Sequence, residues 1–179
     1  DVALAFKYFV EGLPQEERDN CVLIFHCSPS DPNGTDLPRL CRHLMPECNV
    51  AFTYTINDGQ PFHDGMMNKL FNSADVYVNM ASNEGFGLGS AEALTVGTPI
   101  IVNMTGGLQE QVTDGVNWFG YGLEPSSKAI IGSQDVPFIY EDRICGKKFV
   151  AKLVEFYNLS KEEREAMGSM GRKHVLDNY

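Results

Sequence analysis

The clearest candidate for a functional site in this sequence is a pair of carboxylates separated by a glycine-rich run. Glu84 and Glu92 enclose a run with glycines at positions 85, 87 and 89. Glycines let the backbone approach a bound phosphate closely, and a helix N-terminus places about half a positive charge beside it. Carboxylates beside a phosphate are favourable only if they accept hydrogen bonds from neutral hydroxyls, which a sugar or ribose supplies. The pattern therefore predicts a site for a sugar nucleotide.

The flanking sequence predicts a strand before this run and a helix after it. Val76–Met80 is short, β-branched and aromatic, as expected of a buried strand. Leu88–Val96 predicts a helix that ends at Gly97, and Thr98–Asn103 predicts the next strand. In such a β-turn-α-β unit the first helical turns lie above the carboxyl end of the strand, where open α/β sheets bind their ligands.

The glycine spacing does not fit a Rossmann dinucleotide-binding loop. Such a loop needs the pattern G-x-G-x-x-G directly after the first strand of the fold. Here the glycines alternate with other residues from 85 to 89, and the first-strand context is absent. A dinucleotide is therefore not the ligand that this run indicates.

The motif and its neighbours resemble the signature of the family 4 retaining glycosyltransferases, which have the GT-B fold. The similarity extends from about residue 73 to residue 115, and its stretches occur in the same order as in the family. The stretches are Ser73–Val76, Glu84–Leu88, Glu92–Leu94, Gly97–Pro99 and Gly106–Gly115. The resemblance implies the C-terminal, donor-binding domain of such an enzyme. It also implies an α/β fold, with a Rossmann-like parallel sheet and helices on both faces, that forms one half of a GT-B enzyme.

The resemblance assigns roles to residues within these stretches. Glu84 is the catalytic candidate, because it would face the donor sugar near the reacting carbon. Glu92 would accept hydrogen bonds from the ribose hydroxyls. The other residues of the implied nucleotide-sugar site would meet the sugar and diphosphate or lie close to the donor: Gly85, Phe86, Gly87, Leu88, Gly106 and Gly107. Either glutamate alone would be interpreted as a surface acid, and the surrounding block favours the functional interpretation.

Two further positions lie near strands predicted earlier in the chain. The resemblance places the base of the nucleotide beside the loop after the strand predicted over Asn49–Thr55, so Thr55 is a candidate, with an ordinary βα loop as the alternative. The apolar run Cys21–Cys27 predicts a buried strand. Its His26 is interpreted as a packed or strand-end residue rather than a ligand, and Ser28–Gly34 has the composition of a turn.

Length, charge and cysteine content limit the class of protein. The 179 residues fit a single domain over 1–179, and the net charge of −10 argues against nucleic acid or an anionic membrane surface as the default partner. The five cysteines have no metal-ligand spacing and favour free thiols in a reducing compartment. No signal peptide or membrane-spanning run is present in the sequence. We therefore expect a cytoplasmic domain.

The remaining sequence predicts the other elements of a parallel α/β sheet, in which four strands alternate with helices. Thr35 or Asp36 is predicted to cap one helix. Ser160 and Glu163 are predicted to form a capping box at the start of the last helix. The stretch 124–142 is a longer Ser-, Pro- and Gly-containing connection than a compact domain needs, and is interpreted as an insertion. Arg143–Asn158 predicts a helix after it.

The sequence departs from the resembling family at its front. The family's C-terminal domain normally begins with a strand and a basic pair, one Arg and one Lys, that neutralise the donor diphosphate, and this chain starts after that point. We therefore expect a piece of a larger enzyme that is inactive by itself. The acceptor, and any association with a membrane, would belong to an N-terminal domain.

For the parent enzyme, the resemblance implies transfer of a sugar from a nucleoside-diphosphate sugar to a hydroxyl of a carbohydrate, lipid or protein acceptor, with retention of the anomeric configuration. No metal and no other cofactor is expected, because the sequence has no Asp-x-Asp motif or histidine cluster. Two alternatives stay open: a sugar-nucleotide epimerase of the same fold, and a non-catalytic module that binds nucleotide sugars.

Overall fold

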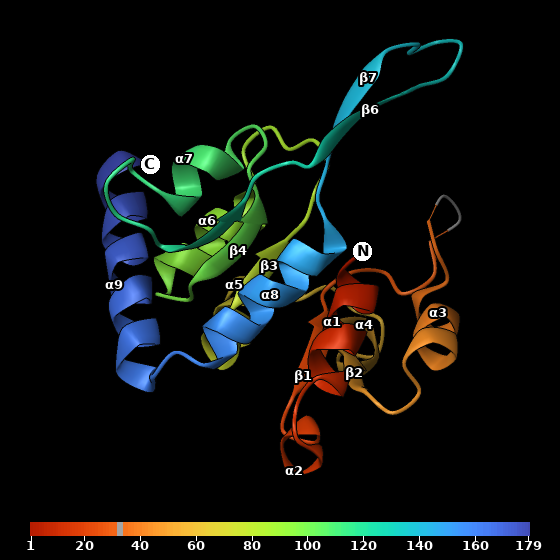
Figure 1. The fold of residues 1–179 in the computed structure, drawn as a ribbon, viewed down its shortest axis with the longest axis horizontal. Helices are drawn as coiled ribbons and strands as arrows, with labels where there is room; N and C mark the ends of the chain where they lie inside the picture. The colour runs from red at the N-terminus through yellow and green to blue at the C-terminus, as the bar shows by residue number, and fades with distance from the viewer. Residues whose placement is uncertain (32–33) are drawn as a thin grey trace. The chain divides into compact units, whose positions relative to one another are not determined.

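The structure, a computed structural model, describes residues 1–31 and 34–179, which form two compact units (Figure 1). The first unit is Asp1–Gly65 and the second is Met66–Tyr179. Part of the turn predicted over 28–34, namely Pro32 and Asn33, lies outside the described residues. Each unit has its own parallel sheet.

The first unit combines a two-stranded parallel sheet with short helices. Its elements are α1 (Val2–Glu11), α2 (Gln15–Arg18), β1 (Val22–Phe25), α3 (Leu37–Leu44), β2 (Asn49–Phe52) and α4 (Thr53–Ile56). β1 and β2 pair in parallel, with Val22 opposite Asn49. The predicted cap of α3 is confirmed, because the Asp36 carboxylate accepts a 3.0 Å hydrogen bond from the amide of Arg39.

The strand predicted over Cys21–Cys27 forms, but it is not buried. Val22 is 53% exposed, and the other residues of β1 are only partly covered. A two-stranded sheet leaves each strand with one bare edge and can cover its faces only in part. Phe25 stacks on Phe52 of β2, with ring centroids 5.5 Å apart, and provides much of the packing that the pair has.

The strand predicted over Asn49–Thr55 is also shorter than expected. β2 ends at Phe52, and the chain turns at once into α4. The Thr53 hydroxyl lies 2.8 Å from Nδ1 of His26 and donates to the carbonyl of Phe25 at 3.4 Å, so it ties this turn to the end of β1. Thr55 therefore lies exposed in a helical turn and not in the loop that follows a strand.

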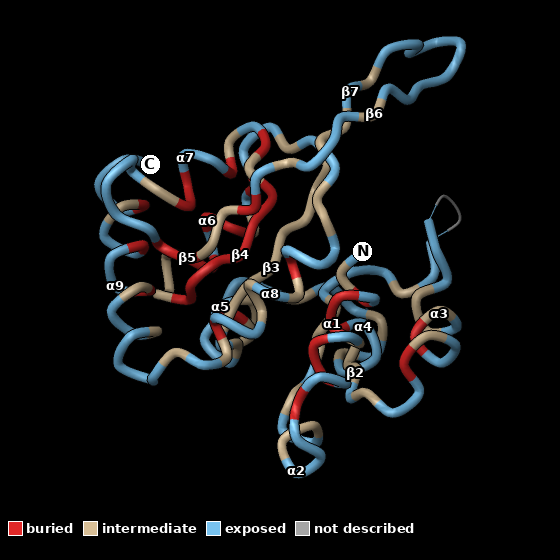
Figure 2. Tube along the Cα trace, in the orientation of Figure 1, coloured by how far each residue is buried: buried red, intermediate tan, exposed pale blue. Residues whose placement is uncertain are grey.

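The second unit is a three-stranded parallel sheet covered by helices, with a hairpin attached. Its elements are α5 (Asp64–Ser73, which begins at the boundary of the units), β3 (Tyr77–Asn79), α6 (Leu88–Thr95), β4 (Ile100–Asn103), α7 (Leu108–Val112), β5 (Gly120–Leu123), β6 (Ser127–Ile131), β7 (Ile139–Arg143), α8 (Gly146–Tyr157) and α9 (Lys161–Asn178). The strand order is β3-β4-β5, and every residue of the central strand β4 is buried (Figure 2).

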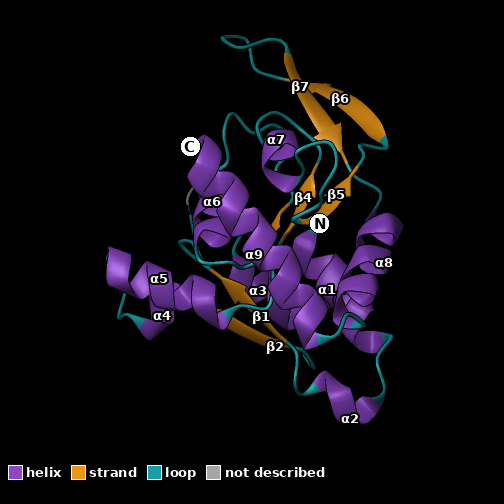
Figure 3. Cartoon of the chain, turned by 90° about the vertical axis from the view of Figure 1, so that its left-hand side faces the viewer, coloured by secondary structure: helices purple, strands orange, loops and turns teal. Residues whose placement is uncertain are grey.

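Close packing of α9 on α6 covers one side of this sheet (Figure 3). Gly168 of α9 lies against Gly97, the residue predicted to end α6. A Cβ at position 168 would lie 1.8 Å from the Gly97 carbonyl oxygen. Gly171 has a similar contact with Leu94. The predicted capping box at the start of α9 is confirmed: Ser160 and Glu163 exchange both hydrogen bonds.

The connection predicted over 124–142 is largely an antiparallel hairpin. β6 and β7 pair with Ile130 opposite Tyr140, and the hairpin projects from the second unit (Figure 1). Its base is fixed to the carboxyl edge of the sheet. The amide of Asp142 donates to the Ser82 carbonyl at 2.7 Å, and its carboxylate accepts from the Thr105 hydroxyl at 2.9 Å. The segment is therefore ordered structure that begins beside the glycine-rich loop.

The predicted α/β class is confirmed, since parallel strands alternate with helices through both units. In the described residues these strands form a two-stranded and a three-stranded sheet. No helix in the described part of the chain is long and apolar enough to cross a membrane.

Candidate nucleotide-sugar site

The glycine-rich loop joins β3 to α6, as the sequence predicts. Gly87 is the N-cap of α6 and has φ +88°, a left-handed conformation that favours glycine. Its carbonyl accepts from the amides of Ser90 and Ala91 at 3.1 Å, which closes the first turn. The earlier amides of a helix have no acceptor within the helix and can bind an anion. The loop therefore ends in an anion-binding geometry.

A second glycine pair lies directly against this loop. The amide of Gly107 donates to the carbonyls of Glu84, at 3.3 Å, and Gly85, at 3.2 Å. Gly106 has φ +50°, and a Cβ there would lie 1.7 Å from the Glu84 carbonyl oxygen. The structure thus brings together two predicted segments, 84–87 and 106–107, that are about 20 residues apart in the sequence.

The two glutamates have different surroundings. The carboxylate of Glu84 is half-buried and accepts a hydrogen bond from Nδ2 of Asn79, at 3.5 Å, while Glu92 is exposed on the second turn of α6. The charges of both glutamates act on the hydroxyl of Tyr77, in β3. Burial first, and then the negative charges of Glu84 and Glu92, raises the pKa of the Tyr77 hydroxyl above its ordinary value. Tyr77 therefore stays a neutral group near both acids at physiological pH.

Of the remaining predicted residues, two lie in the loop or at the start of α6, and one lies in the first unit. Phe86 is 39% exposed and makes an edge contact with the ring of Tyr179, with centroids 5.1 Å apart. Leu88, the first residue of α6, is exposed. Thr55 belongs to the first unit, so its place near the nucleotide base stays a prediction.

Two buried polar residues next to the loop were not predicted from the sequence. Asn103, at the end of β4, donates through Nδ2 to the carbonyls of Ala81, at 2.8 Å, and Asp142, at 2.9 Å. Gln111, in α7, donates to the carbonyl of Phe86 at 2.6 Å. The position of Asn103 as the polar last residue of an otherwise apolar strand was a usable signal. Nothing in the sequence around Gln111 distinguishes it from the exposed Gln109 two positions earlier.

The first unit has a pocket of about 300 Å³ at the carboxyl ends of β1 and β2. His26, Cys27, Ser28, Thr53, Tyr54 and Phe62 are among its lining residues. The ring of His26 packs on Phe62, with centroids 5.4 Å apart, as well as contacting Thr53. This agrees with the interpretation of His26 as a strand-end residue with packing partners. The pocket lies at the strand edge where α/β folds bind ligands.

Residues 35–132 match the family described as "Glycosyl transferases group 1". This segment covers more than half of the chain and contains the glycine-rich loop and the Gly106–Gly107 pair. The chain belongs to the glycosyltransferase group 1 family.

Curated relatives support the assignment to this glycosyltransferase family. The chain is 32% identical over 126 residues to "Uncharacterized glycosyltransferase MJ1607" of Methanocaldococcus jannaschii, covering 69% of this chain and 30% of that protein. It is 35% identical over 147 residues to the D-inositol 3-phosphate glycosyltransferase of Geodermatophilus obscurus, covering 75% of this chain and 32% of the relative. The chain therefore spans about a third of the length of these relatives.

Two solved structures are similar to this chain in fold. A sucrose-phosphate synthase from Thermosynechococcus elongatus matches 99% of this chain and 38% of its own, with a TM-score of 0.63 at 21% identity. The C-terminal domain of a glycosyl transferase group 1 family protein from Francisella tularensis matches 80% of this chain and 60% of its own, with a TM-score of 0.55 at 19% identity. At these identities the likeness concerns the fold, which is that of GT-B enzymes.

Proposed function

We propose that this chain is the donor-binding part of a retaining glycosyltransferase. The whole enzyme transfers a sugar from a nucleoside-diphosphate sugar to an acceptor hydroxyl. The observation that carries the proposal is the contact between the two glycine segments at the N-terminus of α6, where the amide of Gly107 holds the carbonyls of Glu84 and Gly85. This contact shapes a loop of backbone amides beside two carboxylates, which suits a diphosphate that carries two sugar rings.

The proposed mechanism relies on stabilising the leaving diphosphate. As the bond to the sugar breaks, negative charge grows on the phosphate oxygens, and fixed amide donors stabilise that charge without reorganising. The amides of Phe86, Gly87 and Leu88 take this role, with Gly106 and Gly107 close to the donor. No metal or other cofactor is required in this proposal, because the amides and the helix N-terminus neutralise part of the charge.

The carboxylates act on the sugars in this proposal. Glu84, held by Asn79 at 3.5 Å, faces the donor sugar near the reacting carbon and is the catalytic candidate. Glu92 projects from the second turn of α6 and accepts hydrogen bonds from the ribose hydroxyls. The acceptor belongs to a part of the enzyme outside this chain.

The first experiment is a calorimetric titration of the chain with uridine, guanosine and adenosine diphosphates and their common sugar conjugates. The titration is done without metal and then with magnesium. We expect one nucleoside diphosphate to bind without metal, which also identifies the base. Binding that requires magnesium would contradict the metal-free proposal, and absence of any binding would contradict the donor role of this chain.

Glu92→Ala tests the ribose contact. We expect nucleoside diphosphates to bind more weakly by roughly 1.5–3 kcal/mol, the usual contribution of hydrogen bonds to a charged acceptor. Glu165→Ala, which removes an exposed glutamate from α9, is the matched control and should leave affinity unchanged. Equal affinities for the native chain and Glu92→Ala would remove Glu92 from the site.

Glu84→Gln tests the catalytic assignment and separates transferase from binding module. In the whole enzyme we expect loss of sugar transfer while donor affinity is largely kept, since glutamine has the same shape without the charge. Transfer at the native rate would exclude Glu84 from the reaction. Retention is checked separately, by determining the anomeric configuration of the product.

A further inference from the structure

Gln111 is a fully buried polar residue beneath the glycine-rich loop. Its exposed fraction is 0%, and its Nε2 donates to the carbonyl of Phe86 at 2.6 Å. Its Oε1 is also buried and has no hydrogen-bond partner within the described residues. A buried unpaired oxygen is unfavourable, so an apolar side chain would suit this position better if packing were its only role. The hydrogen bond to Phe86 is what the glutamine adds.

That hydrogen bond fixes the direction of the next amide. In a trans peptide the carbonyl and the following N–H point in opposite directions, and the described chain has no cis peptide bond. The carbonyl of Phe86 faces Gln111 on α7. The N–H of Gly87 in the same peptide plane therefore faces away from α7.

The two preceding peptides are held in the same way. The carbonyls of Glu84 and Gly85 both accept from the amide of Gly107, which precedes α7. By the same planarity, the amides of Gly85 and Phe86 also point away from Gly107. Three successive carbonyls thus face the α7 side, and the amides of residues 85–87 face the other. Successive amides on one side of a loop form an anion-binding concavity.

The last of these peptides is the one that most needs a restraint. Gly87 has φ +88°, and glycine has no Cβ to oppose rotation of the peptide before it. A flip of the Phe86–Gly87 peptide would turn a carbonyl oxygen, instead of an N–H, toward a bound phosphate. Gln111 is the side chain that holds this carbonyl on the protein side.

We propose that Gln111 is a positioning residue for donor binding: it holds the Phe86–Gly87 peptide so that the amide of Gly87 meets the donor diphosphate. The inference rests on the proposed function, in which a nucleoside diphosphate binds at this loop. Gln111 acts only through the peptide and touches no substrate atom.

The test compares Gln111→Met with Gln134→Met, a matched control at an exposed glutamine in the β6–β7 hairpin of the same unit. Affinities are measured for the nucleoside diphosphate that the native chain binds and for the nucleoside alone. We expect Gln111→Met to bind the diphosphate about tenfold more weakly or worse. The reason is that the amide of Gly87 no longer donates a hydrogen bond to the charged diphosphate. Affinity for the nucleoside should stay unchanged, and Gln134→Met should behave like the native chain.

Gln111→Glu adds a readout that a packing role would not change. At neutral pH the carboxylate cannot donate to the Phe86 carbonyl, whereas a protonated carboxyl group can. We expect the diphosphate affinity of Gln111→Glu, divided by that of the native chain at the same pH, to recover as the pH falls. The same ratio for Gln111→Met should stay flat. The inference would be overturned if Gln111→Met lost equal affinity for the nucleoside and the diphosphate and the diphosphate affinity of Gln111→Glu did not recover at low pH.

A measurement on the native chain covers the case in which these variants do not fold. On addition of inorganic pyrophosphate, the amide proton of Gly87 should shift more than that of Gly115, a glycine with φ +90° in a separate turn. If the chemical shift of the Gly87 amide proton did not change under saturating pyrophosphate, the inference would be contradicted. A native chain that binds no diphosphate would overturn the proposed function, and the inference with it. Native binding that Gln111→Met leaves intact would overturn the inference alone.

Discussion

The two units bury similar apolar strands to very different extents. In β4 the side chains of Ile100 and Ile101 are fully buried, whereas Val22 in β1 is 53% exposed. Within the described residues, β4 has a paired strand on each edge, while β1 pairs with β2 alone. An apolar run thus specifies a strand, but the number of neighbours and the helices on its faces decide how deeply it is buried.

Glycines show the same contrast. In the second unit, several glycines stand where a Cβ would overlap backbone, as at Gly106 and Gly168. In the first unit, a Cβ at Gly12 would meet its nearest neighbour, a carbonyl oxygen of α1, at 3.4 Å, which is an ordinary contact. The glycine-rich loop belongs to the tightly packed unit. Tight packing allows its peptides to be held in one orientation, which the proposed binding of a diphosphate would require.

The largest difference between the units should come from truncating a core leucine. Leu94 in α6 is fully buried, so we expect Leu94→Ala to lower the free energy of unfolding by about 2–5 kcal/mol. Leu23→Ala in the half-buried β1 should cost clearly less. Denaturant unfolding of both variants gives the comparison. Equal costs would mean that β1 is as well packed as the core of the second unit.

The glycine contrast predicts the next largest effect. Gly168→Ala places a methyl group 1.8 Å from the Gly97 carbonyl oxygen, so α9 must move away from α6. We expect a loss of about 1–3 kcal/mol in the free energy of unfolding, typical of overpacking. Gly12→Ala should be close to neutral by the same measurement. If Gly168→Ala were neutral as well, the close approach of the helices would be unnecessary for stability.

The sequence predicted local structure best where the signal is local. Ser160 with Glu163 and the glycine at position 97 specify helix ends through hydrogen bonds within a few residues, and these predictions are confirmed. The two glycine segments of the site were also predicted, because their residue types and order resemble the family. Their assigned roles in binding and catalysis stay predictions.

Features that depend on distant contacts were not predictable. The hairpin within 124–142 is fixed by Asp142, whose partners Ser82 and Thr105 come from other loops. The burial of Gln111 depends on how α7 sits against the glycine-rich loop, and the sequence does not encode this locally. The organisation of 1–179 as one domain stays a prediction, since the structure has two compact units.

Helix caps should give a smaller effect in both units. Ser160 caps α9 with a complete capping box, whereas Asp36 caps α3 through its hydrogen bond from Arg39. We expect Ser160→Ala to cost about 1 kcal/mol of unfolding free energy, since a cap contributes roughly 0.5–2 kcal/mol. Each substitution removes one hydrogen bond from a backbone amide to a side-chain oxygen, and we expect Asp36→Ala to cost less because α3 has 8 residues and α9 has 18. The reverse order would show that α3 depends on its cap more than α9 does.

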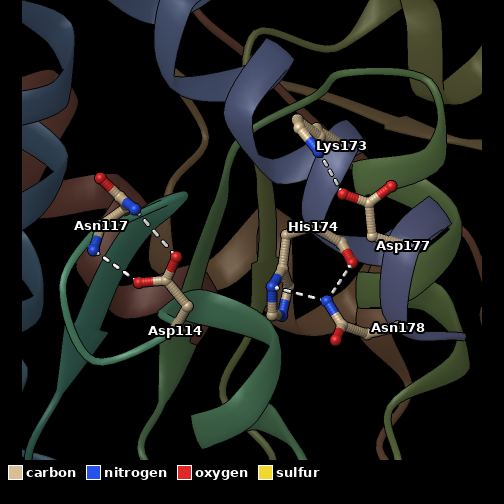
Figure 4. Close-up of polar contacts among 6 residues, drawn as sticks. All are labelled: Asp114, Asn117, Lys173, His174, Asp177 and Asn178. Carbon is tan, nitrogen blue, oxygen red and sulfur yellow. Dashed lines mark hydrogen bonds and ion pairs between the residues drawn. The ribbon is translucent and has the colours of Figure 1, made fainter.

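The smallest predicted effect is a pH dependence at Asp114, in the turn between α7 and β5 of the second unit (Figure 4). Asn117 donates to its carboxylate through the side chain, at 2.9 Å, and through the backbone, at 2.6 Å, and Val116 adds a backbone bond at 2.9 Å. These bonds, those from Asn117 first, lower the pKa of Asp114 from 3.8 to about 2.

Because this pKa is lower in the folded chain than in the unfolded chain, the ionised carboxylate stabilises the fold. The stabilisation is complete above the ordinary pKa of 3.8 and is lost progressively as the pH falls toward and through about 2. Asp114→Asn cannot titrate, so the difference in unfolding free energy between the native chain and this variant should shrink across that window. The group is fully exposed, so the change should be small. A constant difference from pH 5 to pH 2 would show that the bonds from Asn117 and Val116 do not favour the ionised form.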